Sequence, residues 1–138
     1  MRNRTLIALA IAATVALAAC SGSSSSLSGK TWQLTALTHR VAGGFGGVPE
    51  AEQANYTIEF KSDGNYQAKA DCNQVSGAYT TTADGGLTIE LGPTTLVACP
   101  EGSLSDQYIQ ALGNASSYAI ADSLLTITLK DEGTLVFK

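Results

Sequence analysis

The chain has 138 residues, of which 44% are hydrophobic and 14% are charged, and its formal net charge at pH 7 is −4. An acidic chain without a Lys/Arg cluster is a poor candidate for binding nucleic acid. It also lacks the polybasic patch that would hold it on anionic lipid by charge alone.

The N-terminus has the pattern of an export signal. Arg2 and Arg4 precede an uncharged run from Leu6 to Ala18. A run of about 13 apolar residues is too short to span roughly 30 Å of hydrocarbon, but it suits a signal peptide. Leu17-Ala18-Ala19-Cys20 then resembles the bacterial lipobox. We therefore predict a signal peptide over residues 1–19; an ordinary cleavage site that happens to lie beside a cysteine is the alternative.

The lipobox reading makes Cys20 the lipidation site. A diacylglycerol on its thiol, with a further fatty acid such as palmitate on the new amino group, would hold the protein stably on a membrane without a spanning helix. Residues 20–26 then form the lipidated cysteine and a Ser/Gly tether. The expected location is the cell envelope. In a cell with two membranes Ser21 favours the outer one, because it does not resemble a retention signal.

Residues 27–138 form the predicted folded domain, and apolar and polar residues alternate over most of it. This pattern predicts about eight strands in a small antiparallel β-barrel or sandwich. Asp-Gly at positions 63–64 and Asp-Gly-Gly at 84–86 lie between such runs and predict hairpin turns. The runs that we expect to be strands are 32–36, 56–60, 66–70, 78–82, 87–91, 94–98, 118–120, 125–129 and 135–137.

Two segments depart from the alternation. Residues 39–54 read as one long loop that carries Phe45 between glycine pairs. Long loops in compact domains are functional or disordered, so Phe45 is a possible binding residue; the alternative is an insertion without function. Residues 103–112 place Leu104, Tyr108 and Leu112 four apart, which predicts one short amphipathic α-helix. Ser103 is a candidate cap for its first turn.

Lipid on Cys20 would leave two further cysteines, Cys72 and Cys99. In an oxidising compartment such an even pair predicts a disulfide. Two free buried thiols or two ligands of a metal site remain the alternatives.

The residues around these cysteines resemble the META domain (HslJ-like) family. Trp32 stands in a segment similar to the family's opening strand. The run 72–79 is similar to its Cys-Asn motif followed by Gly-x-Tyr, and the run 95–99 to its second motif. Val97 and Gln74 depart mildly from the family's common Met and Arg. The motif residues are Trp32, Cys72, Asn73, Gly77, Tyr79, Thr95 and Cys99.

The resemblance implies a lipocalin-like barrel with one helix, an envelope or secreted location, and a loose association with stress response or envelope maintenance, but no agreed activity. From the residues themselves, Asn73 could adopt a left-handed conformation or bond nearby backbone. Gly77 suggests a bend or bulge, and Trp32 and Tyr79 are expected to fill the core.

Catalytic chemistry finds no support in the sequence. His39 is the only histidine, and no His/Cys/Asp cluster has the spacing of a metal site. Most of the acidic residues lie at predicted turns. We therefore expect a monomeric protein that is not an enzyme and needs no cofactor or metal.

Two functional hypotheses remain. The first is a non-catalytic interaction module that docks an envelope protein or polymer. The second is a carrier of a small apolar ligand in a cavity inside the barrel, although a domain of this size could leave a filled interior.

Overall fold

The structure is a computed structural model that describes residues 26–38 and 46–138. The predicted signal peptide, Cys20, His39 and Phe45 lie outside the described residues.

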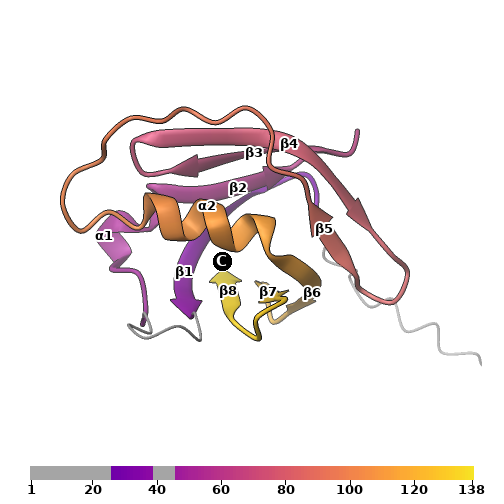
Figure 1. Cartoon of the computed structure of the whole chain (residues 1–138). Helices are drawn as coiled ribbons and strands as arrows, with labels where there is room; N and C mark the ends of the chain where they lie inside the picture. The colour runs from indigo at the N-terminus through magenta and orange to yellow at the C-terminus, as the bar shows by residue number, and fades with distance from the viewer. Residues whose placement is uncertain (1–25, 39–45) are drawn as a thin grey trace, which may run out of the picture.

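Eight antiparallel strands form one nearly closed barrel, as the alternation predicted, and two short helices accompany it where one was expected (Figure 1). The strand order around the barrel is β5-β4-β3-β2-β1-β8-β7-β6. The two end strands meet at a single bridge between Gly86 and Ser117, and the Tyr118 N–H donates to the Gly85 carbonyl at 2.9 Å. The strands are β1 (Thr31–Thr38), β2 (Tyr56–Phe60), β3 (Asn65–Ala70), β4 (Asn73–Thr81), β5 (Leu87–Ile89), β6 (Ala115–Ala121), β7 (Leu124–Leu129) and β8 (Thr134–Phe137).

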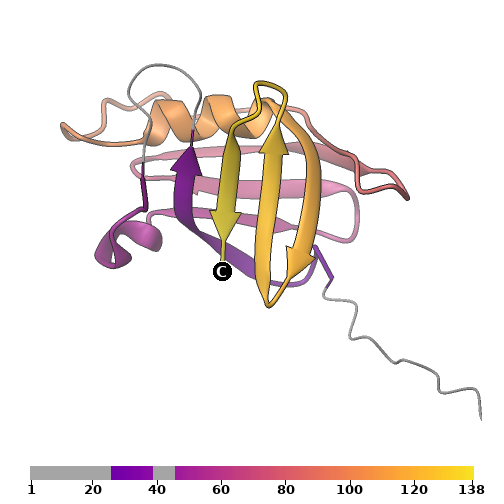
Figure 2. The ribbon, with the colours of Figure 1, turned by 90° about the horizontal axis from the view of Figure 1, so that it is seen from below.

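Strand β1 joins the two halves of the barrel. Its first residues pair with β2 and its later residues pair with β8, with a register shift between Leu34 and Ala36. One half then contains β2 to β5 and the other β6 to β8, and the strands of the two halves cross (Figure 2). Irregular register at a strand that serves two sheets is a usual way to turn a barrel corner.

The barrel interior is filled by side chains from both halves. Trp32, Tyr56, Phe60, Tyr66 and Phe137 are among the largest fully buried side chains. Alternate residues of β3 and β7 face this core and their neighbours face solvent, since successive side chains of a strand point to opposite faces. The alternation in the sequence therefore located the core correctly.

The hairpin turns have the backbone conformations that their residues favour. Gly64 and Gly85 adopt φ of +85° and +88°, in the left-handed region that glycine enters without steric cost. Asp122 and Ser123, between β6 and β7, also have positive φ, as the tight primed turns of two-residue hairpins require.

Helix α2 (Ser105–Gly113) begins two residues later than predicted and buries Tyr108 and Leu112. It lies across one end of the barrel (Figures 1 and 2). The Ser103 hydroxyl accepts from the Ser105 N–H at 3.2 Å, so Ser103 lies just ahead of the helix and bonds its first residue.

Part of the predicted loop 39–54 is structured. A second helix, α1 (Glu50–Gln53), follows Val48, which is buried and whose N–H donates to the Thr35 carbonyl of β1 at 2.7 Å. The Gln53 side chain donates to the Val48 carbonyl at 2.9 Å. The single-helix prediction missed α1 because one turn is too short to show helical periodicity.

The predicted strand 94–98 is not a regular strand, although its residues run beside β4. Pro93 has no N–H to donate, and only Thr94 makes a bridge, to Val75. We call residues 90–104, between β5 and α2, the crossing segment. It arches over the outside of the barrel in Figure 1.

Candidate functional site

Five of the seven motif residues lie where β4 and the crossing segment run side by side: Cys72, Asn73, Gly77, Thr95 and Cys99. Cys72 and Cys99 form a disulfide with a Cα–Cα distance of 5.5 Å, which confirms the predicted pairing. Cys72 occupies the tight turn between β3 and β4, and Asp71 beside it has a positive φ of 57°. The disulfide therefore ties the crossing segment to the end of one hairpin.

Asn73 is the centre of this arrangement. It is only 3% exposed. Its Oδ1 accepts from the Val97 N–H at 2.7 Å, and its Nδ2 donates to the Val97 carbonyl at 3.0 Å. Nδ2 also lies 3.1 Å from the Ser105 hydroxyl of α2. One amide side chain thus satisfies both backbone groups of Val97 and connects β4, the crossing segment and α2.

Thr95 adds a second connection. Its hydroxyl accepts from the Gln74 N–H at 2.9 Å and donates to Asn73 Oδ1 at 3.2 Å. The Thr95 N–H in turn donates to the Gln74 carbonyl at 2.9 Å.

The left-handed conformation considered for Asn73 is adopted instead by Asp71. Asn73 bonds the backbone, which was the other role considered for it.

Gly77 allows close approach rather than a bulge. Its pairing with Tyr66 in β3 is regular. A Cβ at Gly77 would lie 2.1 Å from the Glu90 carbonyl oxygen, and one at Gly92 would lie 2.5 Å from the Ser76 oxygen. The Tyr66 hydroxyl donates to that same Glu90 oxygen at 3.2 Å. Of the predicted bend or bulge, the bulge is wrong, because the pairing is regular and the glycine is needed where two backbones pack together.

Trp32 and Tyr79 lie elsewhere and have structural contacts. The Trp32 indole N–H donates to the Leu27 carbonyl at 2.9 Å, and the ring is buried under the Lys30 ammonium, 3.7 Å from its centroid. The Tyr79 hydroxyl donates to the Lys61 carbonyl at 2.7 Å, and its ring packs edge-on against Phe60. Trp32 fills the core as expected, whereas Tyr79 is only partly buried and packs against the edge of the core.

Aromatic side chains occupy the interior next to α2. Tyr108 packs edge-on against Tyr56, with ring centroids 5.9 Å apart, and also contacts Phe137. Burial raises the pKa of Tyr108 well above its ordinary value and raises the pKa of Tyr66 to about 12. These phenols stay neutral near pH 7, and the rings fill the space that a ligand in the barrel would need.

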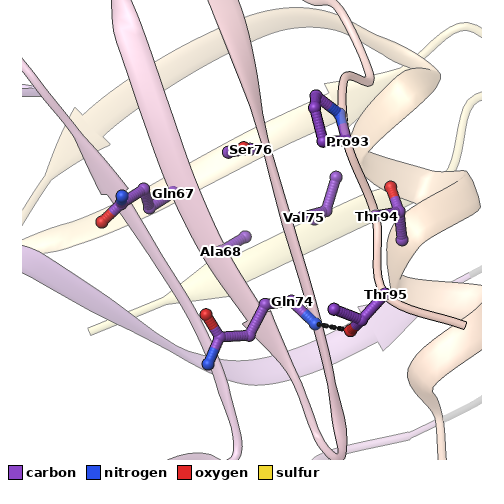
Figure 3. Close-up of a pocket in the computed structure, with 8 residues that line it drawn as sticks. All are labelled: Gln67, Ala68, Gln74, Val75, Ser76, Pro93, Thr94 and Thr95. Atoms are coloured by element: carbon purple, nitrogen blue, oxygen red, sulfur yellow. Dashed lines mark hydrogen bonds between the residues drawn. The ribbon is translucent and has the colours of Figure 1, made fainter. Parts of the chain in front are cut away.

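The hollows that the described residues line lie on the outer surface. One of about 300 Å³ lies between β3, β4 and the crossing segment, and its polar wall includes Gln67, Gln74 and Thr95 (Figure 3). A second, of about 280 Å³, is lined by Asn73, Val97 and Asp106 among others. Both hollows are open to solvent, and neither is an enclosed cavity inside the barrel.

The described part of the chain offers few groups that could carry out acid–base chemistry or bind a metal. It contains no group of three or more His, Cys, Asp or Glu side chains that could hold a metal ion. Hydrogen bonds from Asn65 and from the Thr82 hydroxyl lower the pKa of Asp63 and Asp84 respectively, so these turn carboxylates are ionised and bonded locally. Within the same residues, no helix has the length and apolarity to cross a bilayer.

Sequence reasoning missed one feature of this region. Leu96 and Val97 were assigned to a strand, but they are 90% and 58% exposed. The available signal was Pro93 and Pro100, which flank the run and disfavour a paired strand.

These features define the class of protein: a small, nearly closed antiparallel barrel with an external segment held by a disulfide and a buried asparagine. Comparison with known families then identifies the family to which the chain belongs. The META domain model matches residues 25–138, so the chain belongs to the META domain family. The family resemblance drawn from the cysteine motifs is confirmed.

Two solved structures share the fold. An NMR structure of a protein from Burkholderia xenovorans aligns with a TM-score of 0.62 at 24% identity and covers 81% of this chain and 82% of its own. A crystal structure of a DUF4847 family protein from Bacteroides vulgatus aligns with a TM-score of 0.54 at 16% identity and covers 78% and 89%. No match was found among curated proteins. Neither the META domain nor the DUF4847 family is a known enzyme family, and the likeness extends to fold alone.

Proposed function

We propose that this protein is an envelope lipoprotein, anchored through lipid on Cys20, whose META domain is a non-catalytic interaction module. The observation that carries the proposal is the filled interior of the barrel. Trp32, Tyr66 and Tyr108 are each at most 1% exposed, so their rings fill the interior that the described residues enclose. Any recognition then falls to the outer surface, where loops and grooves are available.

The anchor supports the same proposal from the sequence side. The run 2–20 has the order of a lipoprotein signal, and the Ser/Gly tether that follows would hold the domain near the membrane. Removing Arg2 and Arg4 with the signal leaves six basic residues against twelve acidic ones. An acidic domain on a tether favours a partner with positive charge over anionic lipid.

The alternative of a small apolar-ligand carrier has no observation in its favour. Aromatic rings occupy the barrel beside α2, and the described hollows are open to solvent rather than enclosed. Titration with a hydrophobic dye tests the alternative, because an apolar cavity would give saturable binding.

The anchor is tested by labelling cells with radioactive palmitate. The native chain should take up label and stay with membranes, whereas Cys20→Ser should lose both. Label on the Cys20→Ser chain would refute lipid attachment at this residue.

The interaction role is tested by recovering the chain from its native envelope. Partners retained by both the native chain and Cys20→Ser belong to the domain, and partners lost with Cys20→Ser depend on placement. A second variant replaces residues 43–47, which include Phe45. Unchanged binding by that variant would remove this loop from the proposal while leaving the rest of the surface.

A further inference from the structure

Exposed apolar side chains gather on the crossing segment. Leu96 is 90% exposed and Val97 58%, against 45% for Leu91 and 42% for Leu124, the other large exposed hydrophobic residues of the described chain. Ala98 beside them is also exposed. We call Leu96, Val97 and Ala98 the apolar tip. Single exposed apolar residues are ordinary, but adjacent ones on one segment form a candidate contact surface.

The backbone at the apolar tip is fixed from the inside. Asn73 bonds both the N–H and the carbonyl of Val97, and the disulfide at Cys99 holds the chain just beyond the tip. The Leu96 and Val97 side chains therefore stay in solvent and cannot fold back onto the barrel. A surface that is ordered before binding loses less conformational entropy when a partner docks.

Acidic residues border the apolar tip. Asp106 lines the same hollow as Val97 and Ala98. Glu101 follows two residues after Cys99, and Asp71 precedes Cys72, the other half of the disulfide. None of the residues that line this hollow is basic. Lys69, the lysine of β3, donates to the Asn55 side chain at 3.2 Å. An apolar centre with an acidic border complements a pocket with a basic rim.

The position of the crossing segment also indicates which kind of partner it can contact. The described chain begins at Ser26, on the opposite side of the barrel from the bend of this segment (Figures 1 and 2). A tether at that end would leave the bend of the crossing segment on the side of the barrel away from the anchoring membrane. Position and charge together favour a protein partner over a lipid surface.

We infer that the apolar tip docks into an apolar pocket of an envelope protein whose rim carries Lys or Arg side chains. The inference rests on the proposed interaction role and assigns it to one site. Leu96 and Val97 would be the central contacts, which exclude water, and Asp71, Glu101 and Asp106 would orient the complex.

The test places a photo-crosslinking amino acid, p-benzoylphenylalanine, at one position of the full lipidated chain in its native cells. The three positions are Leu96, Leu124 as an exposed apolar control, and Gln67 in the groove of Figure 3. We expect a discrete protein adduct from position 96 and none from 124.

Dependence on the tip and its border distinguishes docking from chance capture. Adding Val97→Asp should lower the yield of the position-96 adduct at least about tenfold, because a charge would enter an apolar pocket. The pair Glu101→Gln and Asp106→Asn should lower the yield less and reduce its sensitivity to salt. All these side chains are exposed, so melting temperatures should match the parent.

Other outcomes overturn the inference in distinguishable ways. An adduct from Gln67 but not Leu96 would keep the interaction role and reject the apolar tip, and no adduct from any position would count against both. An adduct of twice the chain mass would make a second copy the partner. Leu96→Trp in vesicles of phosphatidylethanolamine and phosphatidylglycerol should keep its red-shifted emission, and a blue shift there would make the membrane the partner.

Discussion

The barrel wall and the crossing segment lie against each other but are held by different interactions. The wall is closed by strand pairing and by apolar side chains such as Phe60 and Ile127 that are fully buried. The crossing segment makes few regular pairings, and a disulfide, Asn73 and Thr95 hold it. Packing is distributed over many contacts, whereas the polar connections are concentrated in a few side chains.

The wall therefore determines the stability of the barrel, and the polar connections determine the position of the crossing segment. A change in the wall acts on the whole barrel, because the side chains of one core pack together and relax only partially around a lost group. A segment held by a few groups keeps one position only while each of them is intact. The variants below therefore should affect the whole barrel in one case and mainly residues 90–104 in the other.

The largest effect is expected in the wall. Trp32→Ala removes a ring that is 1% exposed and the hydrogen bond to Leu27, and it should lower the free energy of unfolding by about 3–5 kcal/mol. Urea unfolding followed by circular dichroism measures it. Leu124→Ala, at an exposed site, is the matched control and should change stability by less than about 0.5 kcal/mol. Equal losses in both variants would contradict the assignment of the core.

The disulfide should give the next effect. Replacing Cys72 and Cys99 together by Ser removes a crosslink between residues 27 apart in sequence. The loss should be about 3–4 kcal/mol, chiefly because the unfolded chain gains freedom. Urea unfolding of the double variant against the oxidised parent measures this loss. Reduction of the parent by dithiothreitol should give a similar value, and a parent unaffected by reduction would contradict it.

Asn73→Ala should act locally as well as globally. It leaves the Val97 N–H and carbonyl without their side-chain partner and should cost about 2–3 kcal/mol. Hydrogen exchange should rise in residues 94–99 more than in β2 or β7. Asn73→Asp keeps the acceptor for the Val97 N–H but places a buried carboxylate oxygen against the Val97 carbonyl, so it should cost at least as much as Asn73→Ala at pH 7. A uniform rise in hydrogen exchange across the barrel would show that the crossing segment and the wall do not respond independently.

The wall could be predicted from the sequence because its rule is periodic. Alternation at Tyr56, Ile58 and Phe60 reveals a buried face directly, and Asp-Gly pairs reveal where strands turn. The disulfide followed from counting cysteines once Cys20 was assigned to lipid. These features depend on short stretches of chain or on simple chemistry.

The crossing segment could not be predicted in the same way. Its position depends on Asn73 meeting Val97, which lies 24 residues away, and no local pattern encodes that contact. Strand β4 was also expected to start at residue 78 rather than Asn73, because Asn and Gly are disfavoured in strands and hide its first half. The motifs revealed which residues matter but not that they hold an exposed apolar tip.

The smallest effect is expected at Tyr108, with the opposite sign. Among the described residues its hydroxyl is buried without a hydrogen-bond partner. Tyr108→Phe removes that group and keeps the ring contacts with Tyr56 and Phe137, so stability near pH 7 should rise by up to about 1 kcal/mol. Urea unfolding at pH 7 measures it, and a loss above about 1 kcal/mol would reveal a partner for the hydroxyl.

The same residue predicts an alkaline transition in the wall. Burial raises the pKa of Tyr108, and raises that of Tyr66 to about 12, above the unfolded value near 10. The neutral phenols therefore contribute stability that is fully present below about pH 10 and is lost as pH rises towards 12 and beyond. Urea midpoints between pH 8 and 12 should fall less steeply in Tyr108→Phe than in the parent. An identical slope would mean that Tyr108 ionises as freely in the folded barrel as in the unfolded chain, and the interior beside α2 would then admit water.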